Sequence, residues 1–282
     1  MSKVVYLNGS FVDYAEAVVP VEDRGFVFAD GVYEVIRFYG GKPFAAEEHL
    51  ARLRRSAEAI KLDGLPSTQE LMEAALETVD RNGCVNATLY LQVTRGPAPR
   101  KHEFPASEVP VTVFMIAREV PRPDAERVNR GVACITVPDI RWHRCDIKSI
   151  ALLPNVLAKQ QAAEAGAAEA IFVRDGIVTE GGSSNFFMVR GECLFTHPAD
   201  EHILAGITRD YVLSLARKLQ IEVREETFGM SEVENADEVF ITSTGIEVLP
   251  VTTIDGKPVG NGVPGPVTKR LWQAFDDSIS KL

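Results

Sequence analysis

The pattern of apolar and polar positions in the first 120 residues predicts a mixture of helices and strands. Apolar residues flank Asn8-Gly9, a dipeptide typical of a type I′ hairpin turn. Apolar residues recur at helical spacing between Glu47 and Lys61, and a capping box at 67–70 begins a second helix. The predicted elements are a hairpin at 4–12, a strand at 32–38, helices at 47–61 and 67–82, and strands at 87–95 and 111–118. Because side chains alternate along a strand, Glu34 shares a face with Val32 and Ile36, and Tyr33 shares the other with Arg37.

The second half of the chain repeats this mixture without repeating the sequence. Pro154-Asn155 introduces an alanine-rich helix, Gly206 begins an amphipathic helix, and Asp175-Gly176 is the turn of a hairpin. The predicted strands lie at 132–137, 147–152, 170–174, 177–180, 186–189, 194–195 and 238–242. The whole chain therefore reads as two α+β halves.

Two segments interrupt the regular elements. Residues 96–105 form a loop of ten residues, rich in proline and basic side chains, between two strands. Hairpin loops are usually about two to five residues long, and longer ordered loops are often functional. Residues 121–124 contain two prolines and have the character of a linker. We therefore expect an N-terminal α/β domain at 1–120, a linker at 121–124 and a C-terminal domain at 125–282.

The composition narrows the class of protein. With 282 residues, 45% of them hydrophobic and 25% charged, the chain has ordinary globular composition. A net charge of −10 argues against nucleic acid or an anionic membrane as a partner. There is no signal-peptide core, no apolar run long enough to span a membrane and no paired-cysteine metal motif. We expect a cytoplasmic protein with reduced cysteines and no metal site.

Lys148 and Glu180 are the first candidates for chemistry. Lys148 lies in a mostly apolar run, and burial lowers the pKa of a lysine so that its neutral amine can attack an aldehyde. Glu180 precedes a Gly/Ser loop and could face a cationic heterocycle. The pair points to pyridoxal phosphate (PLP), with Lys148 as the Schiff-base lysine and Glu180 opposite the pyridine nitrogen. The alternative for Lys148 is an ordinary strand lysine whose amine reaches water.

A PLP enzyme also needs a phosphate site. Ile207-Thr208 starts a helix, where free N–H groups favour an anion, and Ser243-Thr244 adds two hydroxyls after a strand. Each segment could otherwise be a plain helix cap or turn. The helix at 47–61 offers Arg52, Arg54 and Arg55, although helix arginines usually face solvent. Periodicity places Arg54 nearest the apolar stripe and does not select Arg52.

Arg100 and His102 stand two residues apart in the long loop. A guanidinium group suits a carboxylate, and a nearby histidine adds a further donor. The alternative is a basic surface patch without a ligand.

Taken together, these residues resemble the fold type IV PLP-dependent aminotransferases, and most closely the D-amino-acid transaminases. The resemblance covers nearly the whole chain. The motifs that carry it are Glu22–Gly25, Gly31–Val35, Glu48–Leu53, Val93–Gly96, Pro99–His102, Asp139–Trp142, Arg144–Ser149, Thr179–Gly181, Ser183–Asn185, Gly206–Arg209 and Thr242–Thr244. It implies a two-domain α+β fold, with a small N-terminal α/β domain and a larger C-terminal domain built on a β-barrel-like sheet.

The resemblance implies a role for each candidate residue. Lys148 binds PLP and carries protons, and Glu180 faces the pyridine nitrogen. The implied phosphate ligands are Arg52, Ile207, Thr208, Ser243 and Thr244, and Leu204 contacts the cofactor ring. The implied substrate-binding residues are Tyr33, Arg37, Arg100 and His102. The loop that carries Arg100 and His102 comes from a partner subunit, which implies a homodimer.

The implied reaction is transamination between a D-amino acid, such as D-alanine or D-glutamate, and a 2-oxo acid, such as pyruvate or 2-oxoglutarate. Some positions depart from the better-known members of the family. His143 stands where an apolar residue is expected, Gly182 replaces a serine, Arg37 replaces a lysine, and Gly245-Ile246 follows Thr244. The alternatives are a branched-chain L-amino-acid transaminase, a lyase of the aminodeoxychorismate type, an (R)-amine transaminase and a PLP-binding protein without activity.

Overall fold

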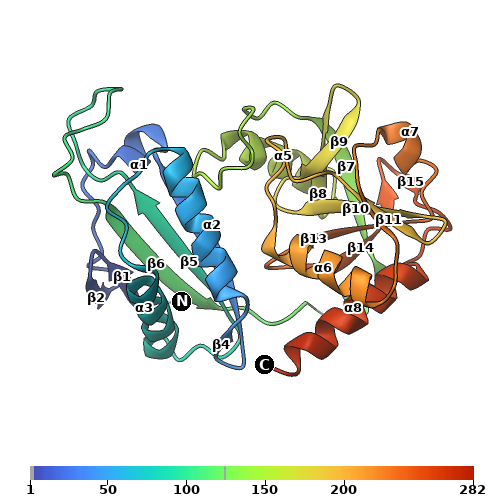
Figure 1. Ribbon diagram of the computed structural model, residues 1–282, viewed down its shortest axis with the longest axis horizontal. Helices are drawn as coiled ribbons and strands as arrows, with labels where there is room; N and C mark the ends of the chain where they lie inside the picture. The colour runs from blue at the N-terminus through green and yellow to red at the C-terminus, as the bar shows by residue number, and fades with distance from the viewer. Residues whose placement is uncertain (1–2, 124) are drawn as a thin grey trace. The chain divides into compact units, whose positions relative to one another are not determined.

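The computed structural model describes residues 3–123 and 125–282, so Asp124 of the predicted linker lies outside the described residues. The chain divides into two compact units (Figure 1). Unit 1 runs to Pro121 and also contains Ile147–Ala151 and Leu282. Unit 2 comprises Arg122–Asp146 and Leu152–Lys281. The division falls inside the predicted linker, but residues 147–151 belong to unit 1 instead of the C-terminal domain.

Unit 1 is a six-stranded antiparallel sheet with helices α2 and α3 packed on one face (Figure 1). Its strands, in the order β2-β1-β6-β5-β3-β4, are Ser10–Asp13, Val4–Leu7, Thr112–Glu119, Ala87–Thr94, Gly31–Tyr39 and Lys42–Pro43. Its helices are α1 (Arg24–Phe28), α2 (Ala46–Ala59) and α3 (Thr68–Arg81). Apolar residues of α2 and α3 and of the central strands make one buried core.

The local signals in this unit were predicted correctly. Asn8 and Gly9 have φ angles of 48° and 88°, as the turn of the β1–β2 hairpin requires. In the capping box of α3, Glu70 N donates to Ser67 Oγ at 3.1 Å, and Ser67 N donates to the Glu70 carboxylate at 2.7 Å. These contacts need only neighbouring residues, which is why the sequence pattern was sufficient.

The predicted strand at 147–152 is wrong. Ser149 makes only an isolated bridge with Val32, while Tyr33 N donates to Lys148 O and Ile150 N donates to Gly31 O, both at 3.1 Å. A Cβ on Gly31 would lie 3.0 Å from Ile150 Cδ1, so the glycine allows this close approach. The apolar residues of the run pack as an irregular segment against the start of β3, and this contact fixes the backbone of Lys148.

Unit 2 is built on a nine-stranded mixed sheet in the order β12-β11-β10-β13-β14-β7-β8-β9, with β15 beside β14. The strands are β7 (Val132–Pro138), β8 (Glu169–Arg174), β9 (Ile177–Gly181), β10 (Asn185–Arg190), β11 (Cys193–Thr196), β12 (Val223–Glu225), β13 (Glu238–Ser243), β14 (Glu247–Ile254) and β15 (Lys257–Pro258). Gly181 N donates to Ser184 O at 2.7 Å, and β9 returns against β10. The sheet is therefore curled, which confirms the expected barrel-like core.

Five helices of unit 2 are described, and four of them pack on this sheet. The five are α4 (Ala125–Arg130), α5 (Leu153–Glu164), α6 (Ile207–Lys218), α7 (Met230–Val233) and α8 (Pro266–Ile279). Helices α6 and α8 pack against β13, and α5 packs against β7 and β8 (Figure 1). Helix α4 packs against β14. Strand β14 and helix α8 were missed by the sequence patterns. In both described ranges, no helix is long and apolar enough to cross a membrane.

Candidate active site

In unit 1, Lys148 lies beside the start of β3. Its Nζ is 4.2 Å from the ring centroid of Tyr33, and its backbone N donates to Ser56 Oγ on α2 at 3.1 Å. The Lys148 side chain is partly buried. The structure thus brings together two residues that the sequence placed in different roles, Lys148 and Tyr33.

A buried polar group lies next to Lys148. It consists of Glu34 on β3 with His49 and Arg52 on α2. Glu34 accepts from Arg52 Nε at 2.7 Å and Nη2 at 2.8 Å, and His49 Nδ1 lies 2.7 Å from Glu34 Oε2. Burial alone would raise the pKa of Glu34, but the hydrogen bond and charge of Arg52, with smaller effects from His49 and Lys148, lower it to about 2. The carboxylate is ionised and holds the guanidinium of Arg52 in one orientation.

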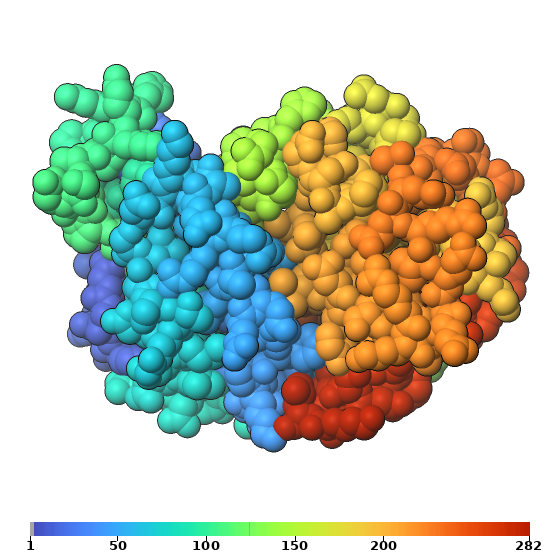
Figure 2. Space-filling view, in the orientation of Figure 1, coloured from blue at the N-terminus to red at the C-terminus, as the bar shows by residue number. Residues whose placement is uncertain are grey.

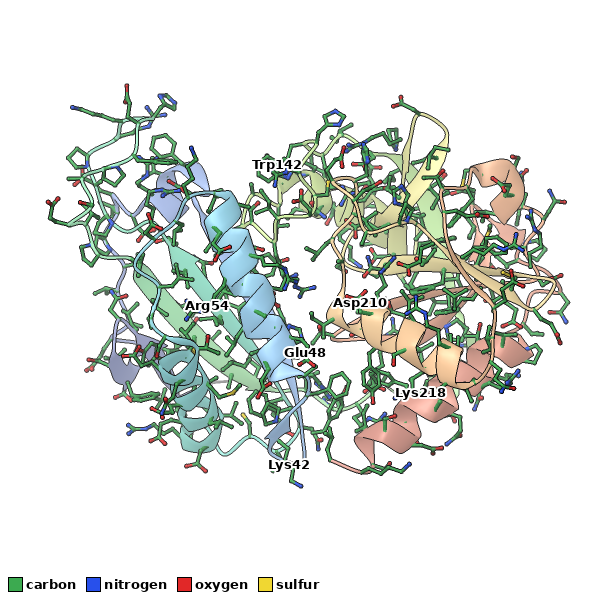
Figure 3. The ribbon with its side chains drawn as sticks, in the orientation of Figure 1. Lys42, Glu48, Arg54, Trp142, Asp210 and Lys218 are labelled. Carbon is green, nitrogen blue, oxygen red and sulfur yellow. The ribbon has the colours of Figure 1, made fainter. Side chains whose placement is uncertain are left out.

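The structure also distinguishes the three arginines of α2. Arg52 is 5% exposed, Arg55 is exposed, and Arg54 donates to Thr68 Oγ1 at 2.8 Å and to Pro66 O at 2.6 Å. Arg54 is marked on α2 in Figure 3. Helical periodicity had placed Arg54 nearest the apolar stripe. Arg52 is buried because Glu34 stands among the apolar residues of β3 and needs a cation opposite it.

In unit 2, Glu180 lies at the end of β9 and is held by three donors. Arg141 Nη1 donates to Oε1 at 2.5 Å, while the backbone N of Leu204 and Asn185 Nδ2 donate to Oε2, each at 3.1 Å. Asn185 Nδ2 also donates to Leu204 O at 2.7 Å. The two predicted residues Glu180 and Leu204 are therefore in contact, and Asn185 fixes the distance between them.

Burial raises the pKa of Glu180 to about 7, although Arg141 lowers it. Arg141 is shared, since its Nε and Nη2 donate to Asp139 at 2.9 Å and 2.8 Å. Asp139 adds a second negative charge that also raises the pKa of Glu180. The protein's own donors do not offset the cost of burying this carboxylate. A further cation facing Glu180, such as a protonated pyridine nitrogen, fits this electrostatic environment.

A candidate anion site lies where α6 begins. Helix α6 has Gly206 as its N-cap, which has no side chain to satisfy the first N–H groups at Ile207 and Thr208. A Cβ on Gly206 would lie 2.1 Å from Asn185 Oδ1, so only glycine lets the helix start this close to Asn185. Asp210, marked in Figure 3, follows in the first turn of α6.

The end of β13 belongs to the same region of unit 2. Asn185 pairs with Thr242 across the β10–β13 ladder, and α6 packs against β13. Ser243 and Thr244 follow directly and are partly buried. Thr242 Oγ1 is buried and has no hydrogen-bond partner among the described residues. Free helix N–H groups, two hydroxyls and an unpaired buried hydroxyl together suit a phosphate group.

The predicted substrate-binding residues lie in three places in unit 1. Tyr33 contacts Lys148 and stacks on Tyr90 at a centroid distance of 5.6 Å. Arg37 is 1% exposed, donates to Val120 O at 2.8 Å and has an unpaired Nη1. Arg100 and His102 are exposed in the long loop, which projects in green from the surface of unit 1 in Figure 2. Both side chains contact the ring of Phe28.

Two residues that depart from the family pattern, Gly182 and His143, lie in unit 2. A Cβ on Gly182 would lie 3.0 Å from Glu169 Oε1 and 3.1 Å from Lys159 Cδ, so a serine would crowd this ion pair. His143 is exposed, and its Nδ1 lies 3.2 Å from Arg174 Nη1. Arg174 also pairs with Asp139 at 3.1 Å, so His143 sits at the surface end of the network that reaches Glu180.

Sequence reasoning gave no role to several residues of these groups. For Glu34 the signal existed, because a carboxylate on the apolar face of a strand requires a partner. For Arg141 and Asn185 the sequence offered only their presence in the motifs of the resemblance. Their contacts with Glu180 join residues 39 and 5 positions apart, and the first depends on the curled sheet.

A family model and individual relatives of known function indicate the same protein family. Residues 31–254 match the family model for class IV aminotransferases. D-alanine aminotransferase from Bacillus licheniformis is 49% identical over 276 residues, covering 98% of this chain and 96% of that protein. The Staphylococcus haemolyticus D-alanine aminotransferase is 46% identical, covering 98% and 97%.

Solved structures give the same fold. The Escherichia coli branched-chain amino acid aminotransferase has a TM-score of 0.91 at 31% identity, covering 98% of this chain and 94% of that one. The T.th. branched-chain amino acid aminotransferase with pyridoxamine 5'-phosphate has a TM-score of 0.92 at 31% identity, covering all of this chain and 95% of that one.

Proposed function

The chain belongs to the class IV aminotransferases, a family of PLP-dependent transaminases, and we propose that it transfers the amino group between a D-amino acid and a 2-oxo acid. D-alanine is the proposed amino donor. D-glutamate, pyruvate and 2-oxoglutarate are the other proposed substrates of the two half-reactions.

The observation that carries the proposal is the incomplete pairing of Glu180. This carboxylate is buried beside an arginine that is shared with Asp139, and its pKa lies at about 7. A pyridinium nitrogen would supply the missing positive charge and keep Glu180 ionised. Glu180 would in turn keep that nitrogen protonated. The anion site at the start of α6 and the end of β13 belongs to the same unit and would bind the phosphate.

When bound, PLP supplies an aldehyde carbon that an amine can attack and a ring that withdraws electrons from the substrate Cα. Lys148 Nζ would bind that carbon and, once displaced by the substrate amine, would remove the proton from Cα. Arg52, with its guanidinium held by Glu34, would bind the phosphate. Leu204 would pack against the ring.

The proposed carboxylate site consists of Tyr33, Arg100 and His102, with Arg37 nearby in the sequence of β3. Arg100 and His102 are exposed, so a second copy of the chain can reach them. The charge of Arg100 would be left unpaired by a substrate that lacks a carboxylate, and such mismatches reduce the specificity constant by up to roughly 10⁴-fold.

We also infer a homodimer. Large apolar side chains are exposed in both units, on the segment before β3 and on α5. They are Val18, Val21 and Phe26 in unit 1, exposed by 77, 79 and 80%, and Leu153, Val156 and Leu157 in unit 2, exposed by 69, 59 and 49%. Surfaces of this kind favour a protein partner. The four cysteines are all free thiols, which supports the inference of a reducing, cytoplasmic location.

The main alternative is that the substrate is an L-amino acid and not a D-amino acid. The relatives with 45–49% identity are D-alanine aminotransferases, whereas the solved structures cited above are branched-chain aminotransferases at 31% identity. The higher identity and the Arg100–His102 pair favour the D isomer. An L-specific branched-chain transaminase is the second candidate, supported by the structural similarity.

One absorbance experiment tests the proposal. The yellow PLP form is mixed with D-alanine, and separately with L-alanine or L-leucine, in the absence of a 2-oxo acid. We expect conversion to the colourless pyridoxamine form with D-alanine alone. Conversion with L-leucine alone would establish the branched-chain alternative. Retention of the PLP form with all three amino acids, together with pyruvate release from aminodeoxychorismate without an acceptor, would indicate a lyase.

A further inference from the structure

The short helix α1 lies beneath the loop that carries Arg100 and His102. Arg24, the first residue of α1, is 4% exposed, and its guanidinium points at the loop backbone. Nη1 donates to Lys101 O at 2.7 Å and to Glu103 O at 3.3 Å, and Nη2 donates to His102 O at 3.4 Å. One side chain therefore binds three consecutive carbonyl groups.

Phe28, one helical turn later, contacts the basic side chains. The Arg100 guanidinium carbon lies 5.1 Å from the centroid of the Phe28 ring, and the His102 ring centroid lies 5.4 Å from it. The Arg24 guanidinium carbon lies 4.9 Å from the same ring. The spacing of four residues puts Arg24 and Phe28 on one face of α1.

The base of the loop is fixed by the residues on either side of α1. Asp23 accepts from the hydroxyls of Thr94 at 2.9 Å and Thr112 at 2.6 Å, one on each strand that borders the loop. Asp30 accepts from Arg24 Nε at 2.8 Å and from Arg95 Nε at 2.8 Å. Burial of Asp30 would raise its pKa, but Arg95 and Arg24 lower it, so the carboxylate stays charged and orients Arg24.

We propose that α1 positions the substrate-carboxylate site: Arg24 fixes the backbone of residues 101–103, and Phe28 fixes the side chains of Arg100 and His102. This inference rests on the proposed function of that pair. A loop held in one conformation binds a carboxylate without the entropy cost of ordering two exposed basic side chains. Arg24 and Phe28 are positioning residues, since they act on the substrate through Arg100 and His102.

Arg24→Lys is the sharpest variant. Lysine keeps the positive charge opposite Asp30, but a single ammonium cannot span three carbonyl groups as the planar guanidinium does. We expect the KM for D-alanine to rise about tenfold while kcat changes less than about twofold, because the chemistry lies elsewhere. Hydrogen exchange of the holoenzyme should accelerate at the amides of residues 98–104.

Phe28→Leu is a second variant that keeps an apolar side chain and removes the ring. It should raise the KM for D-alanine without accelerating backbone exchange, because Arg24 still binds the carbonyl groups. Arg81→Lys, on the exposed side of α3, is the matched control and should leave the KM and the exchange of the loop at wild-type values.

A double-mutant cycle with the paired change Arg100→Ala and His102→Ala decides whether Arg24 acts through these two side chains. In the background that lacks both, Arg24→Lys should raise the KM by less than about twofold further. Independent multiplication of the two effects, an unchanged KM in Arg24→Lys, or equal exchange rates in wild type and variant would each overturn the inference. A wild-type KM in Arg100→Ala alone would instead refute the proposed carboxylate role, while the exchange rates would still decide the contact between α1 and the loop.

Discussion

Each unit of this protein buries a glutamate against an arginine, yet the two carboxylates differ in pKa by several units. In unit 1, Glu34 receives two N–H groups from Arg52 and a contact from His49, and its pKa falls to about 2. In unit 2, Glu180 receives one N–H from Arg141, and its pKa rises to about 7. Burial penalises both charges, so the difference lies in the partners.

The partners differ because Arg141 has two acids to satisfy. Asp139 takes two of its donors and places a second negative charge near Glu180, whereas Arg52 directs two donors to Glu34. The negative charge of Glu34 is therefore balanced within the protein, and this carboxylate orients Arg52. The negative charge of Glu180 is not fully balanced, and a buried ion of this kind can bind a ligand of opposite charge.

Substitution of Lys148, which lies beside Glu34, should have the largest effect. Lys148→Ala should abolish turnover and the visible absorbance of covalently attached PLP, because the variant lacks Nζ, the amine that would bind the aldehyde carbon. Lys148→Arg keeps the charge near Glu34 but cannot form the attachment, so it should be equally inactive. Absorbance spectra and steady-state rates measure both variants. A turnover near the wild-type rate in either one would remove Lys148 from the chemistry.

Glu180→Gln should have the next largest effect. The amide keeps the shape and the hydrogen bonds to Leu204 and Asn185 but cannot stabilise a protonated ring nitrogen. We expect kcat to fall by on the order of 10²–10³-fold, with the free energy of unfolding of the apoprotein nearly unchanged at about pH 5, where Glu180 is protonated. Stopped-flow rates with D-alanine and urea unfolding give the two quantities. An unchanged kcat would mean that Glu180 does not face the cofactor.

Glu34→Gln should mainly lower stability, whereas Glu180→Gln should mainly lower kcat. Removing this charge takes from the buried Arg52 the carboxylate that accepts two of its hydrogen bonds, and breaking a buried ion pair typically costs about 3–5 kcal/mol. Urea unfolding should show this loss, and a weakened phosphate site should raise the dissociation constant of PLP. Glu77→Gln, in an exposed pair with Arg81, is the control and should change stability by less than about 1 kcal/mol. If Glu34→Gln were as stable as the wild type, the charge of Glu34 would have no structural role, and the two glutamates would not differ in the way described.

The smallest effect concerns how the stability of the apoprotein depends on pH. The two carboxylates contribute to this dependence over different pH ranges. The pKa of Glu180 is raised from 4.5 to about 7, so the folded state binds its proton more tightly. Its contribution therefore makes stability fall as pH rises from 4.5 to 7, by at most about 3 kcal/mol. The pKa of Glu34 is lowered to about 2, so its contribution is lost as pH falls from 4.5 toward 2.

Urea unfolding of wild type and Glu180→Gln at about pH 5 and pH 8, on either side of the raised pKa, measures the first range. The difference between the two proteins should change with pH in the direction given. A constant difference would mean that Glu180 has an ordinary pKa in the folded apoprotein.

Much of the fold followed from local patterns. The hairpin at Asn8-Gly9, the capping box of α3 and the helices α2, α5 and α6 were predicted close to their observed limits, because each depends on residues within a few positions of one another. Residues 147–151 were read as a strand since an apolar run has no signal for irregular backbone. Helix α8 and strand β14 were missed although Pro266 lies in the first turn of α8 and Asp255-Gly256 is the turn that follows β14.

By itself, the sequence determined which residues could do the chemistry: a lysine in an apolar run, an acid before a Gly/Ser loop, a helix start and a basic loop. The tertiary structure decided how each is supported. It selected Arg52 over Arg54 by placing Glu34 opposite it, divided Arg141 between two acids, and set α1 under Arg100 and His102. The reason is physical, since ion pairs and loop contacts join residues tens of positions apart, and their energies depend on burial that only the packed sheets create.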